Sequence, residues 1–297
     1  MSRRHLRLLR DCLLALGVGF LIVQGGGKLL PETTPFPLWL GAQALLFCLA
    51  GVAVVTLMQA HLIFAPSEFP RDQPLPIPPD SQELWLEPGI HALWFPKPGA
   101  SEALLYCHGN AGDLSHRIVS ANTLRRELEV SVLAIDYPGF GKSRGAPTEA
   151  SCYASALAGL TWLTSTQGFP LEQTLVLGKS LGGGVATEVA LRHPTLKALI
   201  LSRTFCSIPD MGRRLFRLRL GPLVFHRFDN QAKLPKVSVP VLLLFGSDDT
   251  LCPPVLGEAL LAAANEPKRL VVLEGDQHNT PSDSRYYAAI REWLTKF

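Results

Sequence analysis

A serine between two glycines carries the clearest chemical signal in this sequence. Residues 178–182 read Gly-Lys-Ser-Leu-Gly, with Ser180 at the centre of a G-x-S-x-G pattern. An apolar run at 174–177 precedes the pattern and a helix-like run at 183–192 follows it. A strand, a sharp turn and a helix in this order raise a serine oxygen above the end of a sheet. We therefore predict that Ser180 is a nucleophile, the alternative being a glycine-rich turn whose serine caps a helix.

A serine hydroxyl is a weak nucleophile, so a base and an orienting acid must accompany it. The apolar run at 240–245 leads into Gly-Ser-Asp-Asp, and a later run at 269–273 leads into the loop that contains His278. Residues that follow neighbouring strands meet at one edge of a parallel sheet, in the chain order Ser, Asp, His that this motif requires. His278 is the predicted base. Either Asp248 or Asp249 is the acid, because spacing alone does not choose between them.

Attack on a carbonyl also requires two donors for the negative charge that develops on its oxygen. The first predicted donor is the backbone N–H of Leu181, which follows the nucleophile. The second is expected in the loop 108–112, His-Gly-Asn-Ala-Gly, which follows a strand-like run at 103–107. The backbone N–H of Asn110 is the first choice there, and that of Ala111 is the second. His108 is expected to maintain the shape of this loop.

Taken together, these motifs resemble the α/β-hydrolase superfamily, and within it the membrane-anchored serine hydrolases of the BEM46-like group. The resemblance extends from about Leu62 to the C-terminus and rests on residues 108–112, 136–143, 178–183, 246–249 with 253–254, and His278. It implies a mostly parallel sheet with helices on both faces, a short cap, a Ser-His-Asp triad, and neither a metal nor an organic cofactor. The acid of the family pattern lies three residues after its glycine, which selects Asp249.

One segment departs from the family pattern. Where relatives usually carry a Ser-Pro-Phe-Thr-Ser-like sequence, this chain reads Ser-Arg-Thr-Phe-Cys-Ser at 202–207. Arg203 is therefore a candidate substrate-binding residue at the pocket rim, where its guanidinium would meet an anionic group. The alternatives are an ion pair with Asp229 and a side chain that points into solvent.

The N-terminal quarter is predicted to be a membrane anchor, residues 1–65, with two transmembrane helices. Residues 38–58 contain no charged side chain, and about 20 apolar residues match the hydrocarbon thickness of a bilayer. A shorter run at 12–23 is the first predicted span if residues 29–30 extend it. Arginines at 3, 4, 7 and 10 favour a cytoplasmic N-terminus, so two spans would place the catalytic domain in the cytoplasm. A single span would place it on the other side.

The remainder is predicted to form one α/β domain, residues 80–297, after a proline-rich tether at 66–79. A hairpin is expected near its start, because Pro-Gly at 88–89 separates two strand-like runs. Residues 206–236 interrupt the alternation of strands and helices and form the predicted cap over the site. Four arginines between 213 and 219 give the cap a basic face, which we interpret as solvated in preference to a lipid contact.

The sequence thus predicts a membrane-anchored serine hydrolase of an ester, thioester or amide. A small molecule, an acyl-lipid or an acylated protein is the expected substrate, and the lipid bilayer is the expected partner. The formal net charge of +3 gives no reason to expect nucleic acid. An aminopeptidase-type peptidase is the first alternative, but it would need an acid in the cap, whose only acids are Asp210 and Asp229. A non-catalytic membrane scaffold is the second, and the presence of every triad residue disfavours it.

Overall fold

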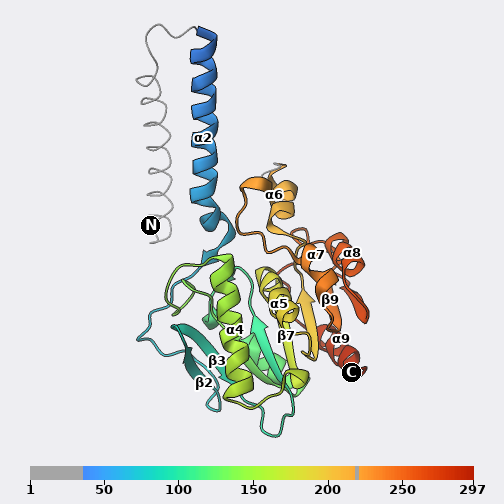
Figure 1. The fold of residues 1–297 in the computed structure, drawn as a ribbon. Helices are drawn as coiled ribbons and strands as arrows, with labels where there is room; N and C mark the ends of the chain where they lie inside the picture. Colours follow the sequence, from blue (N-terminus) through green and yellow to red (C-terminus); the bar gives the residue numbers. More distant parts are fainter. Residues whose placement is uncertain (1–35, 218–220) are drawn as a thin grey trace.

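The computed structural model of the protein describes residues 36–217 and 221–297. Within them, eight strands form the central sheet (Figure 1): β2 (Gln82–Leu86), β3 (Ile90–Phe95), β4 (Ala103–Cys107), β6 (Ser131–Ile135), β7 (Thr174–Lys179), β8 (Ala198–Ser202), β9 (Val241–Gly246) and β10 (Lys268–Leu273). Their order across the sheet is β10-β9-β8-β7-β4-β6-β3-β2. Only β3 runs antiparallel to its neighbours, β2 and β6. The predicted hairpin and the mostly parallel sheet are therefore confirmed.

Helices cover both faces of this sheet. One face packs against α4 (Glu149–Ser165), α5 (Leu181–Arg192) and α8 (Pro254–Ala263), and the other packs against α3 (Ile118–Leu128) and α9 (Ser284–Leu294). Successive residues of a strand point to opposite faces, so Val132 belongs to one core cluster and Leu133 to the other. Burial on both sides explains why the strands read as continuous apolar runs. Short 3₁₀ turns lie at Leu114–His116 and Leu171–Gln173.

The predicted cap segment lies between β8 and β9. It contains α6 (Ile208–Phe216), a 3₁₀ turn at Gly221–Leu223, α7 (Asn230–Lys233) and a second 3₁₀ turn at Leu234–Lys236. The Oγ atom of Ser207 accepts a hydrogen bond from the backbone N–H of Asp210 at 3.2 Å, which caps the start of α6. In Figure 1, α6 stands above the sheet beside the lower end of α2 (Phe36–Ile63).

The long helix α2 leads into the α/β domain from one end (Figure 1). No helix among residues 36–217 and 221–297 is found to be long and apolar enough to cross a membrane. The second predicted span, at 38–58, lies within α2 and therefore receives no support from the structure. The first predicted span, at 12–30, lies outside the described residues.

The proline-rich segment after α2 differs from the free tether that the sequence suggests. It is extended, but it pairs with the domain: β1 (Ala65–Pro66) runs parallel to β5 (Ala111–Gly112). Further along, the Phe69 N–H donates to the Gly141 carbonyl at 3.3 Å, and Leu75 is buried in the core. Prolines prevent a helix here, but backbone groups of Ser67 and Phe69 find partners on the domain.

Candidate active site

Ser180 lies in a sharp turn between β7 and α5. Its backbone adopts φ 53° and ψ −118°, a strained conformation that is found mostly at functional sites. Two glycines make the turn possible. A Cβ atom at Gly178 would lie 2.2 Å from the Gly182 carbonyl oxygen, and one at Gly182 would lie 2.0 Å from the Cys107 carbonyl oxygen. The pattern of glycines around Ser180 thus follows from the close approach of strand, turn and helix.

The structure brings three of the sequence-predicted residues into one hydrogen-bonded chain. Ser180 Oγ lies 3.1 Å from His278 Nε2, and His278 Nδ1 lies 2.8 Å from Asp249 Oδ2. The second carboxylate oxygen of Asp249 accepts the backbone N–H groups of Leu251 at 2.9 Å and Cys252 at 2.7 Å. These two hydrogen bonds fix the buried carboxylate in the orientation that reaches the imidazole.

Of the two neighbouring acids, Asp249 is the one that contacts His278. Asp248 is exposed, and its Oδ1 atom accepts a hydrogen bond from the hydroxyl of Ser247 at 2.8 Å. Spacing alone did not decide between the two acids, and the geometry favours Asp249.

The two predicted oxyanion donors border the same cavity as Ser180. Leu181 is the first residue of α5, so its N–H belongs to the free end of a helix, where the macrodipole favours negative charge. Asn110 lines the same cavity, and its side-chain Oδ1 accepts the N–H of Ala65 at 2.7 Å. Gly109 brings this loop so close that a Cβ atom there would lie 3.3 Å from the Ser180 Cβ.

His108, the first residue of this loop, is fully buried. It takes no part in the hydrogen-bonded chain of Ser180, His278 and Asp249. Its Nδ1 donates to the Gly109 carbonyl at 2.7 Å, and its Nε2 lies 3.1 Å from Asp136 Oδ1. Burial acts to raise the pKa of Asp136, but hydrogen bonds with His108 and His91 outweigh it, so the pKa lies below its usual value. The ionised Asp136 thus holds both rings, and through them the loop.

Arg203 does not occupy the pocket rim, so the expectation of a substrate contact there is wrong. Only 1% of the residue is exposed, and its guanidinium forms an ion pair of 2.6 Å with Asp276. One terminal nitrogen also donates to the carbonyls of Thr280 at 2.6 Å and His278 at 3.4 Å. Both alternatives, a pair with Asp229 and a solvated side chain, are wrong as well. The buried carboxylate of Asp276 supplies the partner that a buried guanidinium requires.

The sequence reasoning missed Asp276. It is 2% exposed and joins Arg203 to Arg285, whose Nη2 lies 2.9 Å from the other carboxylate oxygen. The sequence offered one signal for Asp276: it lies two residues before His278, in the same loop.

A cavity of about 250 Å³ opens beside Ser180. None of the described residues that line it is Asp, Glu, Lys or Arg. Burial raises the pKa of the Cys252 thiol in its wall, so this cysteine is no competing nucleophile. The apolar lining comes from α2, the turn after β7, the segment between β8 and β9, and the loop after β9: Ile63, Leu181, Phe205, Ile208, Pro209, Met211, Leu215, Val224 and Leu251.

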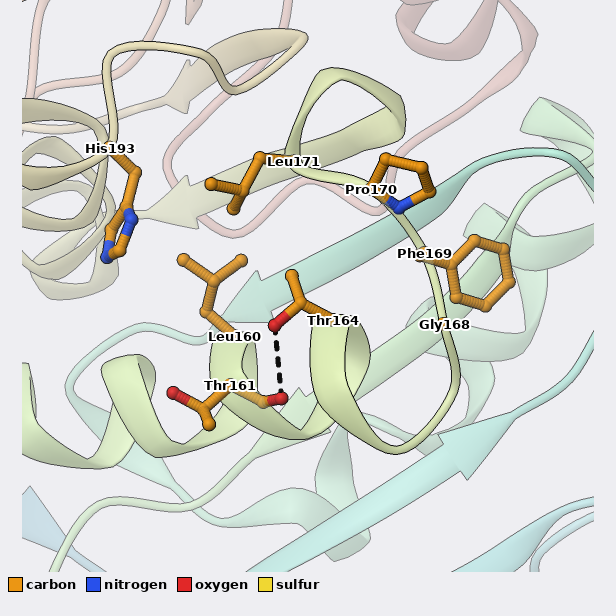
Figure 2. A pocket seen from close by; sticks show the side chains of 8 residues that line it. All are labelled: Leu160, Thr161, Thr164, Gly168, Phe169, Pro170, Leu171 and His193. Carbon is orange, nitrogen blue, oxygen red and sulfur yellow. Dashed lines mark hydrogen bonds between the residues drawn. The ribbon is translucent and has the colours of Figure 1, made fainter.

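Two other hollows lack a nucleophile and a base arranged for catalysis. Figure 2 shows one of about 240 Å³ between α4 and the residues before β7, where the Thr164 hydroxyl donates to the Thr161 carbonyl and His193 stands alone. It lies at the edge of the sheet opposite Ser180. The other, of about 330 Å³, contains Lys179 and Arg117. Burial, followed by the charges of Arg203 and Arg117, lowers the pKa of Lys179 to about 8.

No group of three or more His, Cys, Asp or Glu side chains within residues 36–217 and 221–297 is arranged to hold a metal ion.

Comparisons with known proteins identify the family. The family model described as the alpha/beta hydrolase fold matches residues 102–232. An uncharacterized protein of Mycobacterium tuberculosis is 35% identical over 248 residues, which are 80% of this chain and 88% of that protein. The chain belongs to the α/β-hydrolase family.

Two further comparisons agree with this family. Protein bem46 of Schizosaccharomyces pombe is 34% identical over 164 residues, which cover 53% of this chain and 54% of that protein. An esterase of Pyrococcus furiosus has the same fold, with a TM-score of 0.62 and 17% identity over 79% of this chain and 97% of the esterase. The predicted superfamily is therefore confirmed, and its relatives include bem46.

Proposed function

We propose that this α/β-hydrolase is a serine hydrolase that cleaves an ester, thioester or amide of a lipophilic acyl substrate. One observation carries the proposal: Ser180 Oγ is 3.1 Å from His278 Nε2, whose ring is 2.8 Å from Asp249, at the mouth of an apolar cavity. A nucleophile, its base and an orienting acid within hydrogen-bond reach are the components that acyl transfer requires.

In the proposed mechanism, His278 Nε2 accepts the Ser180 proton as Oγ attacks the substrate carbonyl. Asp249 accepts the Nδ1–H hydrogen bond, which fixes the imidazole tautomer and stabilises the imidazolium that forms. The backbone N–H groups of Leu181 and Asn110 donate to the oxyanion. His278 then returns the proton to the leaving group. In the second half of the reaction it takes a proton from water, whose oxygen attacks the acyl carbonyl. The bond between that carbon and Ser180 Oγ then breaks, and His278 returns the proton to Oγ as the acid leaves.

The character of the cavity supports an acyl group over a peptide N-terminus. An aminopeptidase would need a carboxylate to bind the free amine of its substrate, and the described lining residues include none. Apolar walls favour burial of hydrocarbon by about 25 cal/mol for each Å² removed from water. The peptidase alternative is therefore the weaker one.

We also propose that residues 1–65 anchor the enzyme in a membrane, with residues 80–297 as a cytoplasmic catalytic domain. The support comes from the sequence: 38–58 lacks charge, and four arginines precede residue 11. An acyl-lipid or an acylated protein in the same bilayer is then the natural substrate, although a small lipophilic ester would react by the same chemistry.

Ser180→Ala in the full chain tests the proposed nucleophile. We expect loss of fluorophosphonate labelling and a fall in ester turnover on the order of a millionfold, with an unchanged thermal midpoint. Ser101→Ala, at an exposed loop serine, is the matched control and should label normally. Labelling that persists in Ser180→Ala would refute the assignment.

The paired acids provide a second arm of this test. Asp249→Asn should lower turnover by about four orders of magnitude because it favours the wrong imidazole tautomer. Asp248→Asn should have little effect, since Asp248 is exposed and lies outside the hydrogen-bonded chain. The opposite ranking would contradict the proposed roles.

A further inference from the structure

The chain that joins α2 to the catalytic domain contacts the candidate site from two sides. We propose that residues 59–67, the last turn of α2 and the strand that follows it, are part of the active site. They form one wall of the acyl cavity and position the loop that contains Asn110. We call residues 59–67 the junction segment. This inference rests on the proposed hydrolase function and assigns the junction segment a role in substrate selection.

The wall is made by two side chains one helical turn apart. Gln59 and Ile63 line the same cavity as Ser180 and Leu181, and positions i and i+4 lie on one face of a helix. Gln59 is 5% exposed, and its Oε1 accepts the backbone N–H of Phe225 in the cap at 2.8 Å. The end of α2 is thus attached to the cap, so an acyl group on Ser180 lies between α2 and α6.

An aromatic contact strengthens this attachment. Phe64 is 2% exposed and packs edge-on against His226, with ring centroids 5.4 Å apart, and against Phe228 at 6.1 Å. Edge-to-face ring pairs at these distances stabilise the contact beyond what burial of the rings contributes. A displacement of α2 would therefore move the cap as well as the cavity wall.

The second side of the junction segment meets the proposed oxyanion loop. The Ala65 N–H donates to Asn110 Oδ1 at 2.7 Å, and Ala65 pairs with Ala111 in the β1–β5 ladder. The Ser67 hydroxyl bonds to the carboxylate of Asp113. These contacts fix the side chain of Asn110 and the backbone of Ala111, the residue that follows it. Such positioning matters because a catalytic donor must be held within about 0.5 Å of its productive place.

Ile63→Trp in the full chain tests the wall. With p-nitrophenyl esters from acetyl to dodecanoyl, we expect the ratio of kcat/KM for the long esters to that for the acetyl ester to fall by more than about tenfold. Ile63→Ala should shift the preference toward longer chains, which shows that the profile follows side-chain volume. The matched control is Val119→Trp on α3, where the side chain is 78% exposed and borders no part of the cavity.

Ala65→Pro tests the positioning of the oxyanion loop. It removes the N–H that Asn110 Oδ1 accepts, and Ala65→Val is the control that keeps it. We expect a fall in kcat of about tenfold or more with little change in KM for Ala65→Pro alone, since the lost stabilisation concerns the transition state. The thermal unfolding midpoints of both variants show whether a folding defect, and not the lost hydrogen bond, lowers kcat.

The outcomes separate this inference from the proposed function. An inert wild-type chain, or a fully active Ser180→Ala, would contradict the proposed function. An active wild type whose chain-length profile is the same in Ile63→Trp and Ile63→Ala would overturn the role of the junction segment and leave the hydrolase assignment intact.

Discussion

At the scale of single residues, Arg203 is the most instructive side chain. Its guanidinium is removed from water, which costs several kcal/mol unless a carboxylate and further acceptors replace the solvent. Asp276 and the carbonyls of Thr280 and His278 supply them. Arg203 itself has φ 47°, so its backbone turns sharply after β8. We interpret it as a positioning residue that holds the loop of the proposed base without touching substrate.

Arg203→Met should therefore lower kcat by about 10- to 100-fold while KM changes little, because His278 loses its fixed place relative to Ser180. It should also destabilise the fold by about 3–5 kcal/mol, since Asp276 loses its buried partner and keeps only the half-exposed Arg285. Steady-state ester kinetics and thermal unfolding measure the two effects. Arg285→Met is the control: its side chain is 49% exposed, so its loss should change both quantities only slightly. A kcat that is unchanged in Arg203→Met would contradict the positioning role.

Lys179 gives a prediction about pH. The pKa of its ammonium is lowered to about 8 from a usual value of 10.5, so the folded state binds this proton less tightly than the unfolded state. The resulting penalty, on the order of 1–3 kcal/mol, is fully present below pH 8 and is lost as the pH rises toward 10.5.

Lys179→Met should accordingly raise the midpoint of thermal unfolding at pH 7, and its advantage over the wild type should shrink between pH 8 and pH 10.5. Differential scanning fluorimetry across this range measures the effect. Arg117→Met lacks one of the neighbouring charges and should show a smaller gain in the same direction. An advantage that is independent of pH would exclude the lysine charge as its cause.

At the scale of elements, the sequence was sufficient wherever the signal is local. The strand, turn and helix around Ser180 follow from apolar runs and glycines that are contiguous in the chain. Asp249 and His278 could be found because each follows directly on a strand, and parallel strands end at one edge of the sheet. Elements and catalytic candidates were therefore predictable from patterns within a few residues.

Contacts between distant segments were not predictable in the same way. Arg203 and Asp276 are 73 residues apart, and nothing in either neighbourhood indicates that they pair. The contact between β1 and β5 joins segments 46 residues apart through ladders of two residues, too short to leave an alternating pattern. The proline-rich composition of 66–79 disfavours a helix, but composition does not tell whether such a segment pairs with the domain.

At the scale of the whole molecule, the junction segment connects the proposed anchor to the candidate active site. The same nine-residue stretch from Gln59 to Ser67 lines the cavity, packs on the cap and pairs with the proposed oxyanion loop. If α2 is embedded in a bilayer, the cavity entrance beside α6 lies near the membrane surface. A lipophilic acyl chain would then reach Ser180 without crossing much water, which favours substrates that reside in the same membrane.

The side of the membrane on which Ser180 works is the remaining prediction. Arginines 3, 4, 7 and 10 favour retention of the N-terminus in the cytoplasm, and two spans would return the chain to that side. A reporter that fluoresces only in the cytoplasm, fused after Phe297, should therefore be bright, and one that is active only outside should be silent. Deletion of residues 1–30 removes the charges and the first span together, so it should invert the domain or prevent insertion. An external signal from the intact chain would mean that one segment crosses and that the substrate lies outside the cytoplasm.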